Sequence, residues 1–390
     1  MNVHLRFAML CLIATSCSPE TGEGLDTITT DSTGVTVVSA ESLESLPSRT
    51  PAGPLVDLAF SQDSADSSFS LVGAILRMED GRLVIADGAS RRLKVFGPEG
   101  TYLHTVTGPG GTPAELGSIT AIWHSGTNRI TALDQRKQRV TSVSLDSGDL
   151  QAFDLSSSNP RARPVGRFDS GDVLVRSLIL NVPETGFAEA NIAVIRFGLD
   201  GTKADTIGIW QTARMGRLGQ PPVQLISGPM FEPRFVAAAT GSRLLVSECR
   251  SAEYRVIDAS AGLVQVVRWP VTDPDVTEDD IRLYRARRLA GQIGEQGTRM
   301  QNILDDMPVN ATLPACDVLR VDTEENAWVR SFVRPGAQQQ EWLVFDPEGR
   351  PLFRIELPVA TRIMDLGTSH VTVIEADSLN VERVRVYEIE

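Results

Sequence analysis

The fold of this protein is decided by residues 71–107, which read LVGAILRMEDGRLVIADGASRRLKVFGPEGTYLHTVT. Four short runs in this stretch are rich in Val, Ile, Leu, Phe or Tyr, and they cover residues 71–78, 82–87, 92–96 and 102–107. Gly, Asp, Pro and Ser bound these runs, as they bound antiparallel strands joined by tight turns. We therefore expect a four-stranded antiparallel meander here.

The same turn pattern recurs along the chain. The first turn of each unit is expected near Gly81, Gly126, Gly171, Gly241, Asn326 and Gly367. The third turn of each unit is expected near Gly100, Gly148, Gly201, Gly262 and Gly349. Most first turns follow each other at 41 to 45 residues, which is the repeat length of β-propellers, and two longer intervals leave room for insertions. The pattern predicts an all-β fold, a six-bladed β-propeller of four-stranded antiparallel blades.

Six first turns and five third turns leave the last unit without its outer strand. A propeller can take that strand from the other end of its chain, and Val35-Thr36-Val37-Val38 is the nearest apolar run. We expect an N-terminal strand to complete the last blade in this way, because an unpaired outer edge promotes aggregation. The alternative is an open sheet beside a disordered N-terminal extension.

A short helical insertion is expected between the fourth and fifth blades, at about residues 275–306. Thr277 precedes three carboxylates, Glu278, Asp279 and Asp280, and this order is typical of a helix N-terminus. A second helix is expected within residues 292–306. The insertion would cap one mouth of the central tunnel or pack on the rim of the ring.

Three stretches, at residues 80–88, 92–100 and 108–115, resemble the blade signature of NHL-repeat propellers. Residues 344–350 are a further match. From about residue 35 to residue 390 the chain is therefore similar to a bacterial six-bladed β-propeller family, many of whose members are exported proteins or lipoproteins. The resemblance implies the fold but no particular activity, because most members of this family have no assigned activity.

The first 16 residues resemble a signal peptide. Arg6 precedes an apolar run at residues 7–14, which is much shorter than the ~20 residues that span a bilayer. Ala14-Thr15-Ser16-Cys17 resembles the lipobox of bacterial lipoproteins, with Ala14 where the family usually has Leu. This resemblance implies a membrane anchor through lipidation of Cys17. The alternative is an ordinary signal peptidase site, after which Cys17 has no special role.

Residues 17–34 are mostly Ser, Thr, Glu, Asp and Gly, so we expect a flexible tether that buries little surface. The propeller is then expected to cover residues 35–390. Ser18 resembles the residue that follows the lipidated Cys in lipoproteins of the outer membrane. We therefore expect an exported protein held at the bacterial cell envelope.

The chain carries 37 Lys and Arg residues against 50 Asp and Glu residues, a formal net charge of −13. Such a surface repels phosphate backbones, so nucleic acid is not expected as a partner. The four histidines, at positions 4, 104, 124 and 370, are too few and too scattered for a structural zinc site. The sequence contains no nucleophile elbow, zinc protease motif, P-loop or dinucleotide fingerprint.

Six charged residues end the second strands of the units, on one face near the tunnel. They are Asp87, Asp134, Arg176, Glu248, Arg330 and Glu375. If they converge, they form a ligand site for a cation such as Ca²⁺ or for a polar small molecule. The alternative is that Asp87 and Asp134 accept hydrogen bonds from the turns that follow them, while the arginines neutralise their neighbours.

Two cysteines of the propeller are expected on the same face of adjacent blades. Cys249 lies just past the second strand of the fourth blade, and Cys316 lies near the start of the fifth. In an oxidising envelope they either form a disulfide or remain two separate buried thiols.

The export signal and the lack of a catalytic motif favour a non-catalytic, monomeric propeller without a cofactor that binds a protein, a peptide or a glycan. The alternative is a metal-dependent, lactonase-like hydrolase. In that enzyme Asp87, Asp134, Glu248 or Glu375 would hold a divalent cation in the tunnel. The sequence lacks the Asn and His residues that usually complete such sites.

Overall fold

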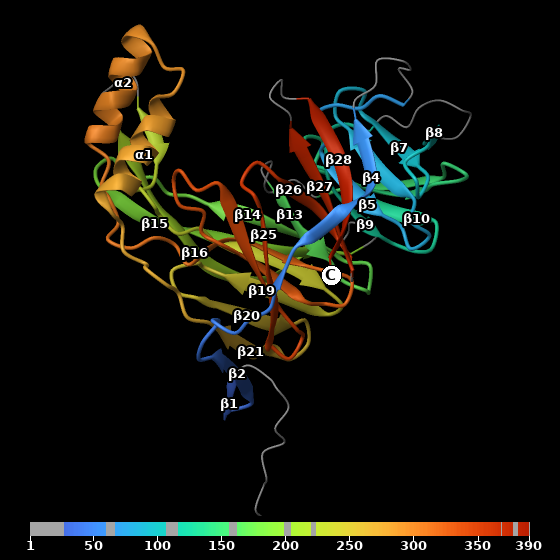
Figure 1. The fold of residues 1–390 in the computed structure, drawn as a ribbon, viewed down its shortest axis with the longest axis horizontal. Helices are drawn as coiled ribbons and strands as arrows, with labels where there is room; N and C mark the ends of the chain where they lie inside the picture. Colours follow the sequence, from blue (N-terminus) through green and yellow to red (C-terminus); the bar gives the residue numbers. More distant parts are fainter. Residues whose placement is uncertain are drawn as a thin grey trace, which may run out of the picture.

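The computed structural model describes residues 27–59, 67–106, 116–155, 162–198, 204–219, 224–367, 369–376 and 381–389. Its strands are arranged as a β-propeller, from which two helices project (Figure 1). The expected propeller arrangement is therefore confirmed. The expected signal peptide, Cys17 and Ser18 lie outside the described residues. Within the described ranges no helix is long and apolar enough to cross a membrane.

The first two sheets are separate four-stranded antiparallel meanders. One contains β5 (Ala74–Arg77), β6 (Leu83–Asp87), β7 (Arg92–Phe96) and β8 (Tyr102–Thr105). The other contains β9 (Ile119–His124), β10 (Arg129–Asp134), β11 (Arg139–Ser144) and β12 (Leu150–Asp154). The turn residues Gly81 and Gly100 have φ angles of 85° and 87°, a region that favours glycine, so these two turns lie where the sequence predicts them.

The next sheet has eleven strands and contains two meanders. One meander is β13 (Arg163–Arg167), β14 (Val173–Ile179), β15 (Phe187–Phe197) and β16 (Ala204–Leu218), to which β17 (Leu225–Ser227) is added. The other is β18 (Val236–Thr240), β19 (Arg243–Ser247), β20 (Glu253–Asp258) and β21 (Gly262–Arg268).

Six separate blades are not confirmed, because hydrogen bonds group the described strands into five sheets, of which four contain a single meander. A parallel pair between Gly166 and Ala239 joins β13 to β18 and so merges two meanders. A Cβ atom on Gly166 would lie 2.7 Å from the Cβ atom of Ala239, so this close approach of two inner strands requires glycine.

The last two sheets each include a strand from the N-terminal part of the chain. One contains β22 (Cys316–Val321), β23 (Ala327–Ser331), β24 (Gln339–Phe345), β25 (Pro351–Pro358) and the parallel strand β3 (Ser48–Arg49). The other contains β26 (Arg362–Leu366), β27 (His370–Ala376), β28 (Glu382–Ile389) and the antiparallel strand β4 (Pro51–Ala59).

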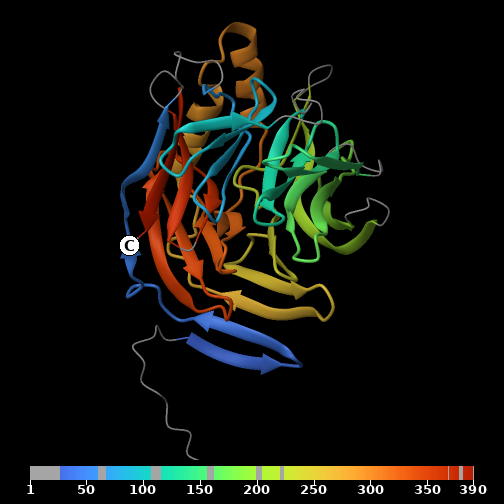
Figure 2. The ribbon, with the colours of Figure 1, turned by 90° about the vertical axis from the view of Figure 1, so that its right-hand side faces the viewer.

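An N-terminal strand therefore completes the last sheet, but the choice of residues 35–38 for it is wrong. The strand is β4, in which Val56 pairs with Val386 of β28 and is buried among the apolar side chains of that sheet and the first one. Pro51 and Pro54 argue against a central strand, but an outermost strand tolerates proline because its outer N–H groups need no partner. Figure 2 shows this strand, in blue, along the edge of the red sheet.

Residues 35–38 belong instead to β2 (Val35–Ala40), which runs parallel to β21 and extends the eleven-stranded sheet. Val38 is buried there. The expected tether is also too long at its C-terminal end, because β1 (Thr27–Ser32) pairs with β2 (Figure 2). Most side chains of β1 are exposed, and the strand is held by backbone hydrogen bonds to β2. Its sequence therefore lacks the alternating apolar pattern from which a strand could be predicted.

The two helices lie between β21 and β22, as the sequence predicts. α1 (Glu278–Leu289) begins with a capping box in which Thr277 and Asp280 exchange hydrogen bonds. α2 (Gly294–Asp305) buries Ile303 and Leu304 in an apolar cluster that also contains Leu218 of β16. The insertion therefore packs on the long β15–β16 hairpin at the rim (Figure 1).

Candidate functional site

A disulfide joins the two meanders next to the helical insertion. The sulfur atoms of Cys249 and Cys316 lie 2.08 Å apart. The N–H group of Ala315 donates a hydrogen bond to the carbonyl oxygen of Cys249 at 2.9 Å, so backbone contacts support the link. Of the two alternatives left open by the sequence, the structure contains the disulfide.

An arginine connects the insertion to the β23–β24 loop. Arg334 donates from Nη1 to Oδ2 of Asp280 at 3.0 Å and also to the carbonyl oxygen of Asp273. Asp280 is thus shared between the helix cap and this loop. The position of α1 beside the β23–β24 loop is therefore held by charged hydrogen bonds as well as by apolar packing.

Below the insertion lies a pocket of about 350 Å³, which we call the inner pocket. Its wall contains three aromatic side chains, Phe231, Tyr284 and Phe332. The charged residues of the wall are Glu232, Arg234, Asp317 and Arg330. Phe231 contacts both other rings edge to face, with centroid distances of 5.3 and 6.3 Å. This volume is in the range of small-molecule sites.

An ion pair lies in the wall of the inner pocket. Nε of Arg330 is 2.6 Å from Oδ1 of Asp317, and Nη1 of Arg330 donates to Oε1 of Gln340 at 3.0 Å. Burial raises the pKa of Asp317 above its ordinary value, although the Arg330 guanidinium acts in the opposite direction. The pair is therefore a fixed, partly desolvated dipole at the pocket surface.

A second carboxylate of the inner pocket is held in its ionised form. Glu232 accepts hydrogen bonds from Arg214 at 2.8 Å and from Asn310 at 2.9 Å. Burial opposes the charge, but these donors outweigh it and leave the pKa of Glu232 below its ordinary value. Arg234 also lines this pocket, is exposed, and has no ion-pair partner among the described residues.

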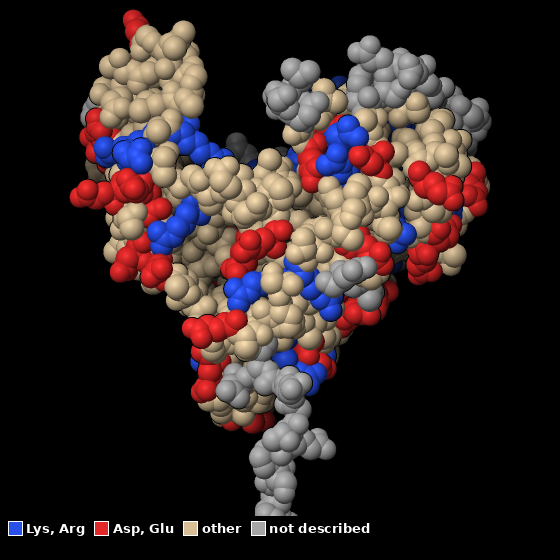
Figure 3. Space-filling view, viewed as in Figure 1, with Lys and Arg blue, Asp and Glu red and all other residues tan. Residues whose placement is uncertain are grey.

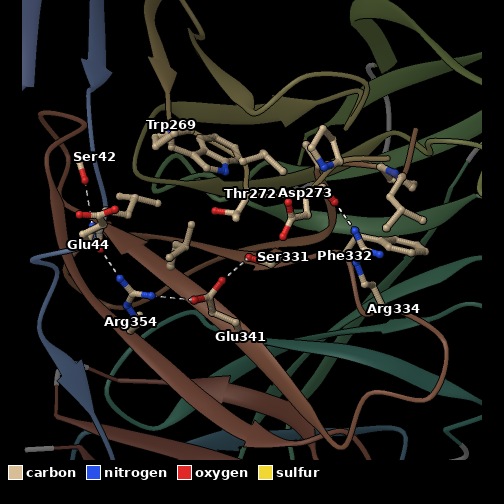
Figure 4. Close-up of a pocket in the computed structure, with 18 of the residues that line it drawn as sticks. Ser42, Glu44, Trp269, Thr272, Asp273, Ser331, Phe332, Arg334, Glu341 and Arg354 are labelled. Atoms are coloured by element: carbon tan, nitrogen blue, oxygen red, sulfur yellow. Dashed lines mark hydrogen bonds and ion pairs between the residues drawn. The ribbon is translucent and has the colours of Figure 1, made fainter. Parts of the chain in front are cut away.

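A neighbouring pocket of about 420 Å³, the outer pocket, opens between the N-terminal segment and the β21–α1 connection (Figure 4). Trp269 lies at one side of it, and Glu341 lies opposite. Glu341 accepts hydrogen bonds from Ser331 at 2.8 Å and from Arg354 at 3.3 Å. Arg354 also donates to the carbonyl oxygen of Leu43, so one arginine connects the pocket floor to the N-terminal segment.

The two pockets adjoin, because Pro314 and Phe332 line both of them. In the inner pocket Glu232 and Asp317 have arginine partners, in the outer pocket Glu341 has one, and aromatic rings provide apolar surface in both. Figure 3 shows acidic and basic side chains interspersed over one face of the molecule and a hollow between the insertion and the sheet that contains β28. The arrangement suits a ligand with polar and apolar parts.

The two predicted aspartates are engaged near their own strand ends. Asp87 accepts hydrogen bonds from the N–H groups of Ser70 and Ala89 at 3.1 and 3.2 Å, and Nζ of the buried Lys94 lies 3.2 Å away. Burial acts against ionisation, but these partners lower the pKa of Asp87. Asp134 accepts three backbone N–H groups at 2.8 to 3.2 Å. Both residues thus accept hydrogen bonds from the turns that follow them, which is the second of the two alternatives given by the sequence.

The other predicted residues also have separate partners. Arg176 donates to the carbonyl oxygen of Phe235 at 2.8 Å, and Glu248 accepts from the N–H of Gln211 at 3.2 Å. Glu375 is paired with Arg385. Among the described residues no hydrogen bond or ion pair joins any two of the six predicted side chains, and of the six only Arg330 contributes to either pocket defined above.

The proposed cation site in the tunnel lacks a matching set of ligands. Within the residues that the structure describes, no three His, Cys, Asp or Glu side chains are grouped as metal ligands. Asp87, Asp134, Glu248 and Glu375 each bind donors of the protein itself. Arg330 neutralises a different neighbour, Asp317, and Arg176 donates to the carbonyl oxygen of Phe235.

Sequence reasoning missed Asp317, Arg234, Trp269 and the aromatic residues of the pockets. Asp317 lies in a β-bulge, because the register of β22 and β23 shifts between Cys316 and Val318. A bulge places a side chain where simple strand alternation does not, so the comparison of strand ends could not find it. The signal available in the sequence was the position of Asp317, a charged residue directly after a cysteine of the expected disulfide.

Comparisons with known proteins show the fold only. No family model and no curated protein matches this chain. A member of the DUF4221 family from Bacteroides vulgatus is similar in structure, with a TM-score of 0.50 and 10% identity over 88% of this chain and 98% of that one. A gluconolactonase from Xanthomonas campestris has a TM-score of 0.42 and 12% identity over 88% of this chain and 99% of that one. Virginiamycin B lyase from Staphylococcus aureus has a TM-score of 0.40 and 10% identity over 85% of this chain and 98% of that one.

Proposed function

We propose that this protein is an exported, lipid-anchored propeller that binds an extended segment of a partner, peptide or glycan, in the inner and outer pockets and catalyses no reaction. The observation that carries the proposal is the pair of adjoining pockets, of about 350 and 420 Å³, which share Pro314 and Phe332 in their linings. Two consecutive pockets suit two consecutive groups of one extended ligand.

The chemistry of the pockets supports binding. Three of their carboxylates, Asp317, Glu232 and Glu341, already hold arginines, so these groups are preorganised. The rings of Phe231, Tyr284 and Phe332 add apolar area with little conformational freedom to lose. The exposed Arg234 adds a positive charge for an acidic group on the ligand.

The architecture belongs to the same proposal. We count the eleven-stranded sheet as two blades, which makes a ring of six in the manner of NHL-repeat-like propellers. The ring is a monomer whose rigid face carries the pockets. Residues 1–16 are removed as a signal peptide, and a lipid on Cys17 holds the body at the envelope, at the outer membrane if Ser18 acts as the sorting residue. The disulfide fits this compartment.

Site-specific photo-cross-linking tests the binding function. A benzoylphenylalanine in place of Tyr284 reports on the inner pocket, and the same residue in place of the exposed Leu352 of β25 is the matched control. We expect discrete adducts in intact envelopes from position 284 alone, and fewer of them when Phe332→Ala is added. Equal adducts from both positions, or none from either, contradict the proposal.

Fractionation tests the anchor separately. Cys17→Ser should move the protein from the membrane fraction to the soluble fraction and leave its melting temperature unchanged. Metabolic labelling with palmitate should mark the wild-type protein alone. If the wild-type chain is never labelled, the lipid anchor is wrong even where export is correct.

A further inference from the structure

The sheet β9–β12 changes from apolar to polar along the face that it turns toward β13. Leu133, Val140 and Phe153 form a cross-strand row on this face and pack against the next meander. The next row on the same face, two residues along each strand, is Thr131, Ser142 and Gln151. Trp123 of β9, opposite Thr131, still packs in the apolar cluster, so the face turns polar on β10, β11 and β12 but not on β9.

A pocket of about 360 Å³ lies where the two rows meet, lined by the polar row and also by Val140 and Phe153 of the apolar one. Ser125 and Arg129, at the turn between β9 and β10, contribute to it from one meander, and Arg167 of β13 contributes from the other. Arg129 donates to Oγ of Ser142 at 3.2 Å, and Arg167 donates to the carbonyl oxygen of His124 at 3.0 Å. These bonds hold both guanidinium groups at the pocket wall, and within the described part of the chain each has further N–H groups for which no bond is seen.

The pocket is locally positive in a chain of net charge −13. Two arginines line it, and no carboxylate is among its described lining residues. Burial lowers the pKa of Arg167, while Asp169 and Asp172 in the following turn act in the opposite direction. An arginine nevertheless stays protonated at physiological pH, so the wall keeps its charge.

Three polar atoms of the lining are buried and have no hydrogen-bond partner among the described residues. They are Oγ of Ser125, Oγ1 of Thr131 and Nε of Arg167. Thr131 is only 1% exposed, so its hydroxyl has lost its water. An unsatisfied buried polar atom destabilises the fold, so three of them beside one pocket favour a polar ligand there.

We propose that this pocket binds a phosphate group carried on a small hydroxylated molecule. Guanidinium groups offer planar pairs of donors that match the oxygens of a phosphate, and hydroxyl groups donate to the same oxygens. The pocket is larger than a phosphate ion, and Ser142 and Gln151 face the additional space with groups that both donate and accept hydrogen bonds. A hydroxylated carbon skeleton matches those groups.

Calorimetric titration of the full mature protein in low-salt, phosphate-free buffer tests the proposal. The probes are glycerol 3-phosphate, inorganic phosphate and glycerol. We expect the tightest binding for glycerol 3-phosphate, weaker binding for inorganic phosphate, and none for glycerol. Binding of neither phosphate compound overturns the proposal, and so does equal binding of glycerol.

Two variants with a matched control locate the binding. Arg129→Gln should weaken glycerol 3-phosphate binding at least tenfold, and Thr131→Val should weaken it severalfold without lowering the melting temperature. Arg139→Gln on β11 is the control, because Arg139 lies outside the pocket and is already paired with Asp154 at 2.7 Å. Equal loss in Arg129→Gln and Arg139→Gln indicates a general charge effect and overturns the site, as does an unchanged affinity in both pocket variants.

Discussion

Arg330 and Asp317 form an ion pair across a β-bulge, with 2.6 Å between Nε of the arginine and Oδ1 of the carboxylate. Asp317 is the extra residue of the bulge and directly follows Cys316 of the disulfide. The disulfide, the bulge and the ion pair therefore shape the same wall of the inner pocket. A change in any of them should alter both stability and the pocket.

The loss of stability on replacing Arg330 should depend on pH, because Arg330 is the ion-pair partner of Asp317. Burial raises the pKa of Asp317, so its contribution to stability falls as the pH rises from the ordinary Asp pKa through the raised one. Arg330→Gln removes the guanidinium group that limits the rise in the pKa of Asp317. We expect the free energy of unfolding to drop by about 2 kcal/mol at pH 7 and by less at pH 4, in urea titrations. Adding Asp317→Asn should recover part of the loss, and a loss that is independent of pH contradicts this account.

The N-terminal strand should be required for the stability of the whole ring. Val56 of β4 is 4% exposed and packs beside Val386, whereas its neighbour Leu55 is 54% exposed. Val56→Ala should lower the free energy of unfolding by about 2 kcal/mol, and Leu55→Ala should change it by less than about 0.5 kcal/mol. Chemical denaturation measures both. Similar losses in the two variants would show that β4 does not pack on the last sheet.

The disulfide closes a long loop and should stabilise the protein by restricting the unfolded chain. Cys249 and Cys316 are 67 residues apart in the sequence, for which the chain-entropy model gives about 4 kcal/mol. The double variant Cys249→Ala, Cys316→Ala should melt at a lower temperature than the oxidised protein. Reductant should lower the melting temperature of the wild-type protein to a similar extent and leave the double variant unchanged. If reductant has no effect on the wild-type protein, the bond does not contribute in solution.

The shared carboxylate of Asp280 should hold the helical insertion in place. It accepts hydrogen bonds from Thr277 within the capping box and from Arg334 of the neighbouring loop. Asp280→Asn weakens both interactions and should speed tryptic cleavage within α1 severalfold, for a cost of about 1–2 kcal/mol. Asp279→Asn, in the same helical turn but exposed, is the control. Equal cleavage rates would mean that apolar packing alone positions the insertion.

Short-range features of this protein follow directly from its sequence. Turns at Gly81 and Gly100, the alternating strands between them and the cap at Thr277 depend on neighbours within a few residues, so composition and spacing predict them. The helical insertion and the propeller arrangement follow from the same local signals repeated along the chain.

The tertiary structure alone decided which distant segments meet. β4 completes the last sheet although its prolines argue against a strand, because that edge position needs no outer donors. The apolar run at residues 35–38 matches either edge by composition, and only packing selects β21. Likewise Arg330 has several carboxylates within its sheet and on adjacent sheets as candidate partners, and a bulge in one strand selects Asp317. Such choices depend on contacts across tens to hundreds of residues, where local periodicity contains no information about register or partner.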